Sequence, residues 1–312
     1  MGLPVLYYRG IQMIYTLTIN PSLDYIMEMD EFNAGKMNRS KDTYVLPGGK
    51  GINVSQVLTG LGIENVAVLP VAGFTGEKLL SLLSEKEIAY DALFLKKGDT
   101  RINVKVLAGI ETELNAPGPE ISDEEQKELL EKLDKLKEGD CLVLSGSVPS
   151  NLGDHFYAHI MERLANKNVK IVVDTIGGNL KNALIYKPFL VKPNKEELEA
   201  LFDTKTETKE ELLNLAREVQ KMGAKNVLVS KGAEGAILLT ESYEVYEAAA
   251  PKGKVVNTVG AGDSMVAGFL AGYIQTGDME SALKWGIAAG SAGAFSKNLA
   301  TKEEIDALLE IL

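Results

Sequence analysis

Asp263 stands at the most chemically suggestive point of the chain, between a glycine-rich turn and a run of small apolar residues. Residues 258–264 have the sequence Thr-Val-Gly-Ala-Gly-Asp-Ser. Glycines let a backbone approach a ligand closely, and the apolar run predicts the first turns of a buried helix. Because a helix N-terminus has unpaired N–H donors, it favours negative charge, and a carboxylate beside it can accept a proton. The combination indicates phosphoryl transfer to a hydroxyl, although this loop alone would favour a simple helix cap.

A second glycine-rich segment, residues 47–53, precedes another expected helix. Its sequence, Pro-Gly-Gly-Lys-Gly-Ile-Asn, contains more glycine than one turn needs. The spacing matches neither the nucleotide phosphate-binding loop nor the dinucleotide-binding fingerprint. We therefore interpret the segment as a close approach of the backbone to a polar substrate, with Asn53 as an added donor and acceptor.

Polar side chains near expected strands are further candidates for substrate binding. Asp24 follows the first strand. Its position fits two interpretations equally well: the carboxylate accepts hydrogen bonds from sugar hydroxyls, or it only forms a local turn. Arg101 and Asn103 share one face of a later strand, and a guanidinium suits a substrate phosphate. Lys105 follows on that face, where the alternative is an outward charge on a surface strand.

Residues 192–197, Lys-Pro-Asn-Lys-Glu-Glu, begin a helix after an apolar strand. Asn194 and Glu197 form a capping-box pattern, and they also suit water around a magnesium ion on nucleotide phosphates. The two interpretations are compatible.

Further along the chain, residues 230–235 predict a hairpin turn. The small residues 288–294 predict a helix that packs closely or lines a site for an adenine ring.

Short β-branched runs alternate with amphipathic stretches along the chain. This alternation predicts a three-layer α/β/α fold, with a doubly wound, mostly parallel sheet and helices on both faces. Ligands of such sheets bind at the carboxyl ends of the strands. We expect strands at residues 15–19, 65–71, 141–145, 170–174, 189–192 and 226–230, and helices at 52–61, 77–87, 123–136, 152–166, 195–201 and 209–222.

Residues 24–47 and 99–116 break this alternation with period-two patterns typical of exposed antiparallel strands. We expect them to form a small separate sheet. Because such a sheet exposes an apolar face, it should cover a site, pair with a second copy in a homodimer, or both.

Residues 13–312 are assigned to one domain. Residues 1–12, which precede a second methionine, are interpreted as an extra segment from an upstream start or an expression remnant.

A net charge of −11 limits the classes of partner. It disfavours nucleic acid and anionic membranes as the main partner. No apolar run reaches the ~18 residues that are needed to cross a bilayer. We expect a cytoplasmic enzyme, whose site would need local positive charge to bind an anionic substrate. Cys141 lies in an apolar strand pattern and is interpreted as a buried, unreactive thiol. His155 and His159 lack a third nearby ligand for zinc.

Taken in order, these segments resemble the phosphofructokinase B family of the ribokinase superfamily, from Met13 onward. The most specific are residues 48–53, residues 258–264 and the Lys-Pro-Asn that begins at Lys192. Within the family, residues 20–24, 100–105, 112–115 and 145–149 are most similar to bacterial enzymes that phosphorylate fructose 1-phosphate. The resemblance implies a ribokinase-like fold and ATP-dependent formation of fructose 1,6-bisphosphate.

The resemblance also implies roles for individual residues. Asp263 is the expected general base, and the N–H groups of Gly260, Ala261 and Gly262 form an anion hole facing the transferred phosphoryl group. Glu197, through water, and Asn194 are expected at a magnesium ion. The residues expected to contact the acceptor are Asp24, Gly48, Gly49, Lys50, Asn53, Arg101, Asn103 and Ser145. Those expected to contact the nucleotide are Lys192, Asn194, Ser230, Lys231, Gly232, Gly235, Thr258, Gly260, Gly262 and Ser291.

Several alternatives stay open at this point. Tagatose 6-phosphate and fructose 6-phosphate are other acceptors that the motifs allow. A protein that binds nucleotide and sugar phosphate without catalysis is an alternative of a different class, because a fold does not by itself imply a reaction. Some relatives use a monovalent cation, and residues 295–301 do not clearly identify its ligands, so potassium dependence is also open.

Overall fold

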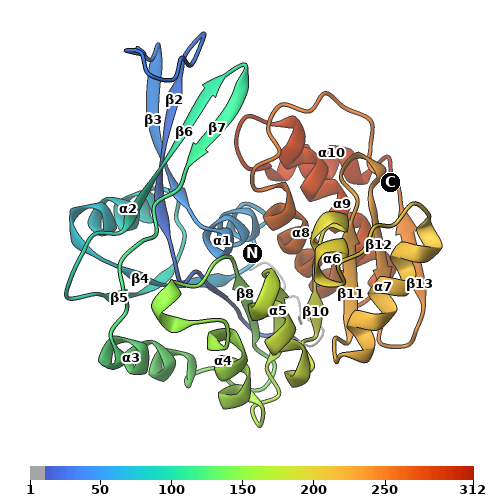
Figure 1. Cartoon of the computed structure of the whole chain (residues 1–312). Helices are drawn as coiled ribbons and strands as arrows, with labels where there is room; N and C mark the ends of the chain where they lie inside the picture. The colour runs from blue at the N-terminus through green and yellow to red at the C-terminus, as the bar shows by residue number, and fades with distance from the viewer. Residues whose placement is uncertain (1–10) are drawn as a thin grey trace, which may run out of the picture.

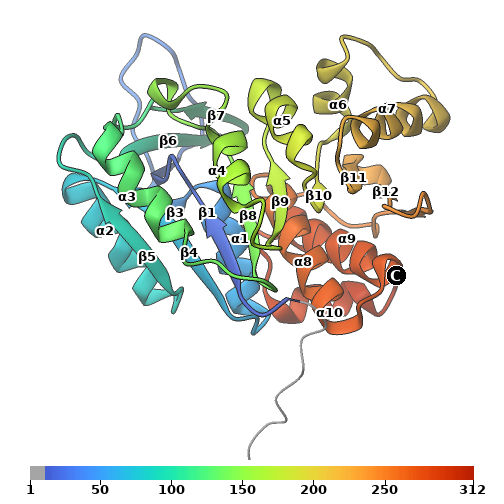
Figure 2. The ribbon, with the colours of Figure 1, turned by 90° about the horizontal axis from the view of Figure 1, so that it is seen from below.

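The protein is built around a nine-stranded sheet that is parallel except at one edge (Figures 1 and 2). A computed structural model describes residues 11–312. The antiparallel edge is formed by the last two strands of the sheet, β12 and β13. The order is β13 (Val245–Ala248), β12 (Ala236–Leu239), β11 (Asn226–Ser230), β10 (Leu190–Val191), β9 (Lys170–Asp174), β8 (Cys141–Ser145), β1 (Ile14–Leu17), β4 (Asn65–Val71) and β5 (Tyr90–Phe94).

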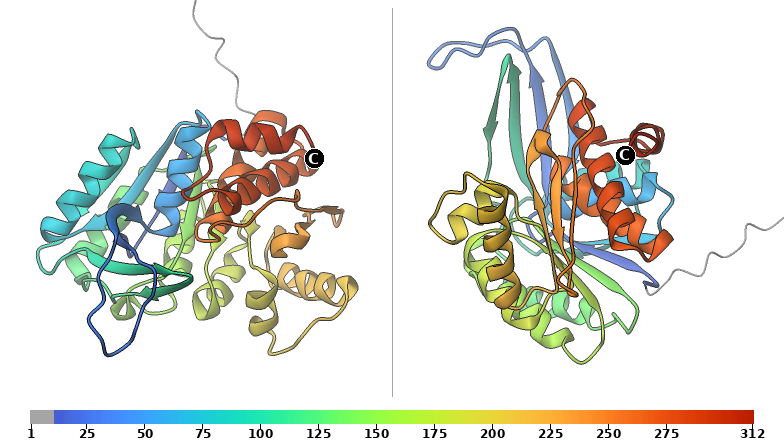
Figure 3. Two further views of the ribbon diagram at one scale, coloured as in Figure 1. Left: turned by 90° about the horizontal axis from the view of Figure 1, so that it is seen from above. Right: turned by 90° about the vertical axis from the view of Figure 1, so that its right-hand side faces the viewer.

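Helices cover both faces of this sheet (Figure 3). Leu142 and Leu144 of β8 join one buried cluster, and Cys141 and Val143 join the other. Successive side chains of a strand face opposite sides, so a strand between two helical layers must be apolar throughout. One layer contains α3 (Asp123–Leu133), α4 (Phe156–Leu164), α5 (Gly177–Ala183), α6 (Lys195–Leu201) and α7 (Lys209–Lys221). The other contains α1 (Lys50–Gly60), α2 (Gly73–Glu85), α8 (Ala261–Thr276), α9 (Met279–Phe295) and α10 (Lys302–Leu309).

The expected three-layer fold is therefore confirmed, and most element bounds agree closely with those predicted. Two strands, β1 and β10, are shorter than expected. Helix α4 begins at Phe156 rather than Leu152 because Ser150–Leu152 form a 3₁₀ turn that ends at Gly153, whose φ is 70°. A residue with a positive φ interrupts a helix, and glycine adopts that conformation without strain.

The expectation that Cys141 is buried is confirmed. The residue is fully buried, and burial raises the pKa of its thiol to about 12.

A second, four-stranded sheet projects from the core as the expected lid (Figure 1). Its order is β3 (Asp42–Gly48), β2 (Ser22–Glu28), β6 (Arg101–Ala108) and β7 (Ile110–Leu114). The prediction of purely antiparallel strands is wrong for one pair, since β2 and β6 run parallel. Both follow core strands, β1 and β5, which are parallel within the main sheet, so both leave the same end of that sheet in the same direction. Strands β3 and β7 then return antiparallel.

The predicted extra segment, residues 1–12, lies outside the described residues except for its last two. Ile11 is 1% exposed within the cluster that contains α1 and α8, and the Gln12 amide donates to the Gly139 carbonyl at 2.6 Å. The packed part of the chain thus includes Ile11 and Gln12. Within residues 11–312, no helix is both long enough and apolar enough to span a membrane.

Candidate active site

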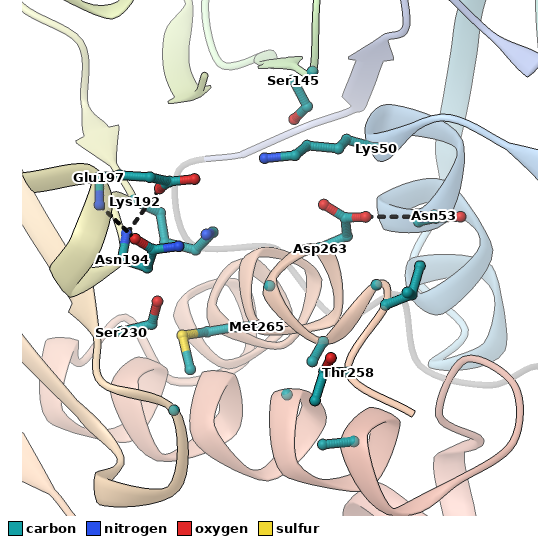
Figure 4. Close-up of a pocket in the computed structure, with 18 of the residues that line it drawn as sticks. Lys50, Asn53, Ser145, Lys192, Asn194, Glu197, Ser230, Thr258, Asp263 and Met265 are labelled. Carbon is teal, nitrogen blue, oxygen red and sulfur yellow. Dashed lines mark hydrogen bonds between the residues drawn. The ribbon is translucent and has the colours of Figure 1, made fainter. Parts of the chain in front are cut away.

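A cleft of about 1040 Å³ lies between the lid and the carboxyl ends of the core strands. The loops after β8, β10 and β11, the N-termini of α1 and α8, and the inner face of the lid all contribute to its walls. Every site residue predicted from the sequence lines this cleft except Gly48. Segments separated by more than two hundred residues along the chain, such as those of Asn53 and Asp263, therefore form one site (Figure 4).

Gly48 supports the site from behind rather than lining it. A Cβ atom built on Gly48 would lie 2.3 Å from Asp24 Oδ1 and 2.4 Å from Ser22 Oγ. Any side chain at position 48 would displace the Asp24 carboxylate. The structure thus places Gly48 next to Asp24 and outside the cleft lining, where its lack of a side chain leaves room for a residue that does line the cleft.

Asp24 is held in place by three side chains of the lid. Its Oδ1 accepts hydrogen bonds from Ser22 Oγ at 2.7 Å and Asn103 Nδ2 at 3.3 Å. Its Oδ2 pairs with Lys105 Nζ at 3.1 Å, and Lys105 also pairs with Glu113 at 3.5 Å. A carboxylate fixed by several donors keeps one orientation, so Asp24 offers a rigid acceptor to a ligand in the cleft.

Asp263 lies at the start of α8 with its carboxylate 95% shielded from solvent. Its Oδ2 accepts a hydrogen bond from Asn53 Nδ2 at 2.8 Å (Figure 4). Burial, and after it the nearby charge of Asp174, raise the pKa of Asp263 to about 6, although Lys50, Asn53 and Lys192 oppose the rise. A carboxylate with a pKa near neutrality is a stronger base than an exposed aspartate, which suits proton abstraction.

Asp174, at the end of β9, was not identified from the sequence. Its Oδ1 lies 3.3 Å from Lys50 Nζ and 3.5 Å from Lys192 Nζ, and the side chain is almost completely buried. Burial acts to lower the pKa of Lys50, but the charges of Asp174, Asp263 and Glu197 outweigh it and the pKa is raised. Asp174 thus lies within ion-pair distance of both lysine ammonium groups. Its position directly after the apolar strand residues 171–173 is the signal that would have identified it.

The turn before α8 presents N–H groups to the cleft. Gly260 adopts a left-handed φ of 78° at the helix N-cap, a conformation that favours glycine. Ala261, expected in the anion hole, instead donates its N–H to the Thr258 carbonyl at 3.2 Å. The N–H groups of Gly260, Gly262 and Asp263 have no acceptor among the described residues. Three N–H groups of this turn are therefore available to an anion, whereas the Ala261 N–H, which was predicted to be one of them, is used within the turn.

Arg101 joins the lid to the core through the main chain. Its Nε and one terminal nitrogen donate to the Asn20 carbonyl at 3.2 and 2.9 Å, and the other terminal nitrogen donates to the Ala116 carbonyl at 3.1 Å. One N–H on each terminal nitrogen is left for a ligand. Arg101 lines the cleft, so it can both fix the base of the lid and contact an anion.

The residues predicted to contact the nucleotide line the same cleft, several of them just after β10 and β11. Asn194 and Glu197 form the predicted capping box: Asn194 Oδ1 accepts from the Glu197 N–H at 2.7 Å, and Glu197 Oε2 accepts from the Asn194 N–H at 2.9 Å. Lys231 lines the cleft, but its ammonium is paired with Glu247 of β13 at 2.7 Å. The other residues predicted for the nucleotide that line the cleft are Lys192, Ser230, Gly232, Gly235, Thr258 and Ser291.

The donor chemistry at this end fits a hydrated magnesium ion. Over the described residues, no group of three or more His, Cys, Asp or Glu side chains is arranged to hold a metal. Magnesium binds few protein ligands when substrate phosphates and water supply the others. Glu197 has one carboxylate oxygen outside the capping box, and Asp174 Oδ2 is buried without a hydrogen-bond partner. Asn194 Oδ1 is already used by the helix cap.

Comparisons with known proteins identify the family of this chain. Residues 18–306 match the pfkB family of carbohydrate kinases. A 1-phosphofructokinase of Bacillus subtilis is 46% identical over 297 residues, covering 95% of this chain and 97% of that protein. A D-tagatose-1-phosphate kinase of Bacillus licheniformis is 37% identical over 295 residues, covering 94% and 96%.

Solved structures give the same result. Phosphofructokinase-2 from Escherichia coli in complex with fructose-6-phosphate has a TM-score of 0.90 at 30% identity, covering 96% of this chain and 98% of that one. The same protein in complex with potassium has a TM-score of 0.91. The fold and these relatives define a phosphotransferase with a ribokinase-like fold. The chain belongs to the pfkB family of carbohydrate kinases.

Proposed function

We propose that the protein transfers the γ-phosphoryl group of ATP to the free primary hydroxyl of fructose 1-phosphate, giving fructose 1,6-bisphosphate and ADP. The observation that carries this proposal is Asp263, a buried carboxylate of raised pKa. It lies near two lysines and beside N–H donors that have no acceptor within residues 11–312. The identity with the 1-phosphofructokinase of Bacillus subtilis supports the choice of acceptor.

In this mechanism Asp263 accepts the proton of the acceptor hydroxyl while Asn53 holds its carboxylate in orientation. The N–H groups of Gly260, Gly262 and Asp263 stabilise the negative charge on the transferred group. Lys50 and Lys192, both paired with Asp174, add positive charge near the same turn. Bound magnesium would neutralise charge on the nucleotide phosphates, with Glu197 as its nearest protein contact through water.

The acceptor is proposed to lie under the lid. Asp24, oriented by Ser22, Asn103 and Lys105, would accept hydrogen bonds from sugar hydroxyls. Arg101 and Ser145 would bind the phosphate that is already on the sugar. The Ser145 hydroxyl supports this, because its oxygen is buried, lines the cleft and has no partner among the described residues.

A monovalent cation is proposed as an activator, because phosphofructokinase-2 from Escherichia coli has been solved with potassium. The test compares turnover in potassium chloride with turnover in tetramethylammonium chloride at the same ionic strength. A higher rate in potassium supports the proposal, and equal rates contradict it.

The experiment that tests the main proposal is a panel of phosphosugars assayed by coupled detection of ADP. We expect the highest kcat/KM for fructose 1-phosphate, with lower values for tagatose 1-phosphate, tagatose 6-phosphate and fructose 6-phosphate. A higher value for tagatose 1-phosphate would instead assign the activity named for the Bacillus licheniformis relative. Saturable binding of ATP and sugar phosphate without ADP release would indicate a binding protein.

A further inference from the structure

Tyr157 is a buried residue whose hydroxyl reaches the wall of the cleft from behind. It lies in the second position of α4, is 0% exposed, and does not line the cleft. Its hydroxyl donates to the Ser145 carbonyl at 3.0 Å and lies 3.3 Å from the Gly146 carbonyl oxygen. The tyrosine ring packs in the core cluster between the sheet and its helices, so the hydroxyl is its only polar contact with the site.

The segment that Tyr157 contacts leaves the sheet abruptly. Gly146 has a left-handed φ of 89°, so the backbone turns sharply after β8. The Gly146 N–H donates to the Asp174 carbonyl at 3.0 Å, and its own carbonyl accepts from Thr175 Oγ1 at 3.1 Å. This turn therefore connects the end of β8, which carries Ser145, to the end of β9, which carries Asp174.

Ser145 is the residue of this turn with an unused polar atom. Its Oγ is buried, without a hydrogen-bond partner among the described residues, and the residue lines the cleft near Lys50 (Figure 4). A buried hydroxyl without a partner is costly unless a ligand supplies one. The position of this hydroxyl depends on the backbone of residues 145 and 146, and Tyr157 is a side chain that holds both carbonyls from the core side.

We propose that Tyr157 is a positioning residue for the acceptor phosphate and acts by fixing the Ser145–Gly146 turn. This inference rests on the proposed function, in which Ser145 binds the phosphate already on the sugar. Burial and the charge of Asp174 raise the pKa of Tyr157 above its ordinary range, so the hydroxyl stays a donor at working pH. Phenylalanine would fill the same space but leave the Ser145 carbonyl without this donor.

The test uses Tyr157→Phe, Ser145→Ala and the double variant. We expect Tyr157→Phe to raise the KM for the sugar phosphate about fivefold to tenfold, the size of one hydrogen bond, and to leave the KM for ATP unchanged. In the Ser145→Ala background, Tyr157→Phe should add no further increase, because the two residues act as one unit. Tyr15→Phe is the matched control: Tyr15 packs against the same core cluster but lies in β1, away from the turn.

Two results would overturn the inference. One is an equal change, or no change, in both KM values for Tyr157→Phe, which would mean a purely structural role. The other is a full additional effect in the double variant, which would mean that Tyr157 does not act through Ser145. The assay uses whichever phosphosugar the wild type turns over best. Calorimetric titration with fructose 1-phosphate gives the same comparison without turnover, so failure of the proposed reaction is distinguishable from failure of this inference.

Discussion

At the scale of single residues, the proposed chemistry depends on the protonation of Asp263. A general base must be ionised, and the pKa of Asp263 in the free protein is raised to about 6. We expect kcat/KM to fall about tenfold for each pH unit below this value, because the active fraction of the free enzyme falls in that proportion. The measurement is a pH profile from about pH 5 to about pH 8 at subsaturating acceptor. A flat profile across this range would remove Asp263 as the base.

Asp263→Asn should separate catalysis from stability. The folded chain holds the Asp263 proton more tightly than the unfolded chain, whose pKa is near 3.8, so ionised Asp263 opposes folding above about pH 6. The variant removes this penalty, and we expect its unfolding free energy to rise by about 1–3 kcal/mol at about pH 8 and to be unchanged at about pH 4. Turnover should fall by about 10²–10⁴.

Urea unfolding at the two pH values, with the activity assay in parallel, checks both expectations. Asn53→Asp is not a useful comparison because it adds a second buried charge. Thr258→Ser, a small change next to the same turn, is the control. We expect its unfolding free energy to stay close to that of the wild type at both pH values. Equal destabilisation of Asp263→Asn at both pH values would show that the buried charge does not oppose folding.

At the scale of elements, the lid contacts the segment after α9 through Lys297. Its ammonium pairs with Glu28 of β2 at 2.5 Å and lies 5.1 Å from the ring centre of Tyr44 in β3. Its carbonyl accepts from Asn257 Nδ2 at 3.3 Å, two residues before the loop that begins at Val259. Lys297 therefore links the lid to the segment that precedes the glycine-rich turn before α8.

Lys297→Ala should loosen this link. We expect the KM for the sugar phosphate to rise only a fewfold, because an exposed ion pair contributes little, and the difference from wild type to shrink at high ionic strength. Steady-state kinetics at low and high sodium chloride measure both effects. Lys302→Ala, which breaks an exposed pair with Asp306 on α10, is the control. A salt-independent loss of kcat would contradict a role confined to the lid.

The elements themselves were largely predictable from local sequence. Asn194 and Glu197 mark the start of α6, and their capping box is present in the structure. Strand β8 was identified by its unbroken apolar residues, which follow from burial on both faces. Strand β5 at the sheet edge was missed because partial exposure gives it no clear apolar pattern. The parallel pairing of β2 with β6 was missed because pairing depends on which core strands precede them.

At the scale of the whole molecule, the outer face of the lid predicts a homodimer. The inner face carries Asp24, Arg101 and Asn103, and alternation along β2 and β6 turns apolar residues outward. Tyr25, Ile102 and Leu114 on that outer side are 37%, 40% and 56% exposed. Contiguous exposed apolar residues on a small sheet are typical of an interface with a second copy.

Leu114→Glu should break this dimer. A charge buried at a two-fold interface is repeated in both copies, so we expect a shift from dimer to monomer at micromolar concentration. Light scattering measures the mass of each species. Ile311→Glu, at an exposed apolar residue far from the lid in sequence, is the control and should leave the mass unchanged. A wild-type protein that is monomeric at all concentrations would contradict the prediction.

The sequence by itself determined the turn at Gly260, the capping box of α6 and the apolar strands, because each depends on neighbours along the chain or on a repeated pattern. Many of the residues that line the cleft were indicated by the resemblance of its motifs to a known family. Tertiary structure alone decided which of these side chains meet. Asp174 holds Lys50 and Lys192, Asn53 orients Asp263 across 210 residues, and Lys231 turns to Glu247. Such pairings follow from the order of strands in the sheet, and a sheet brings together strand ends that no local pattern connects.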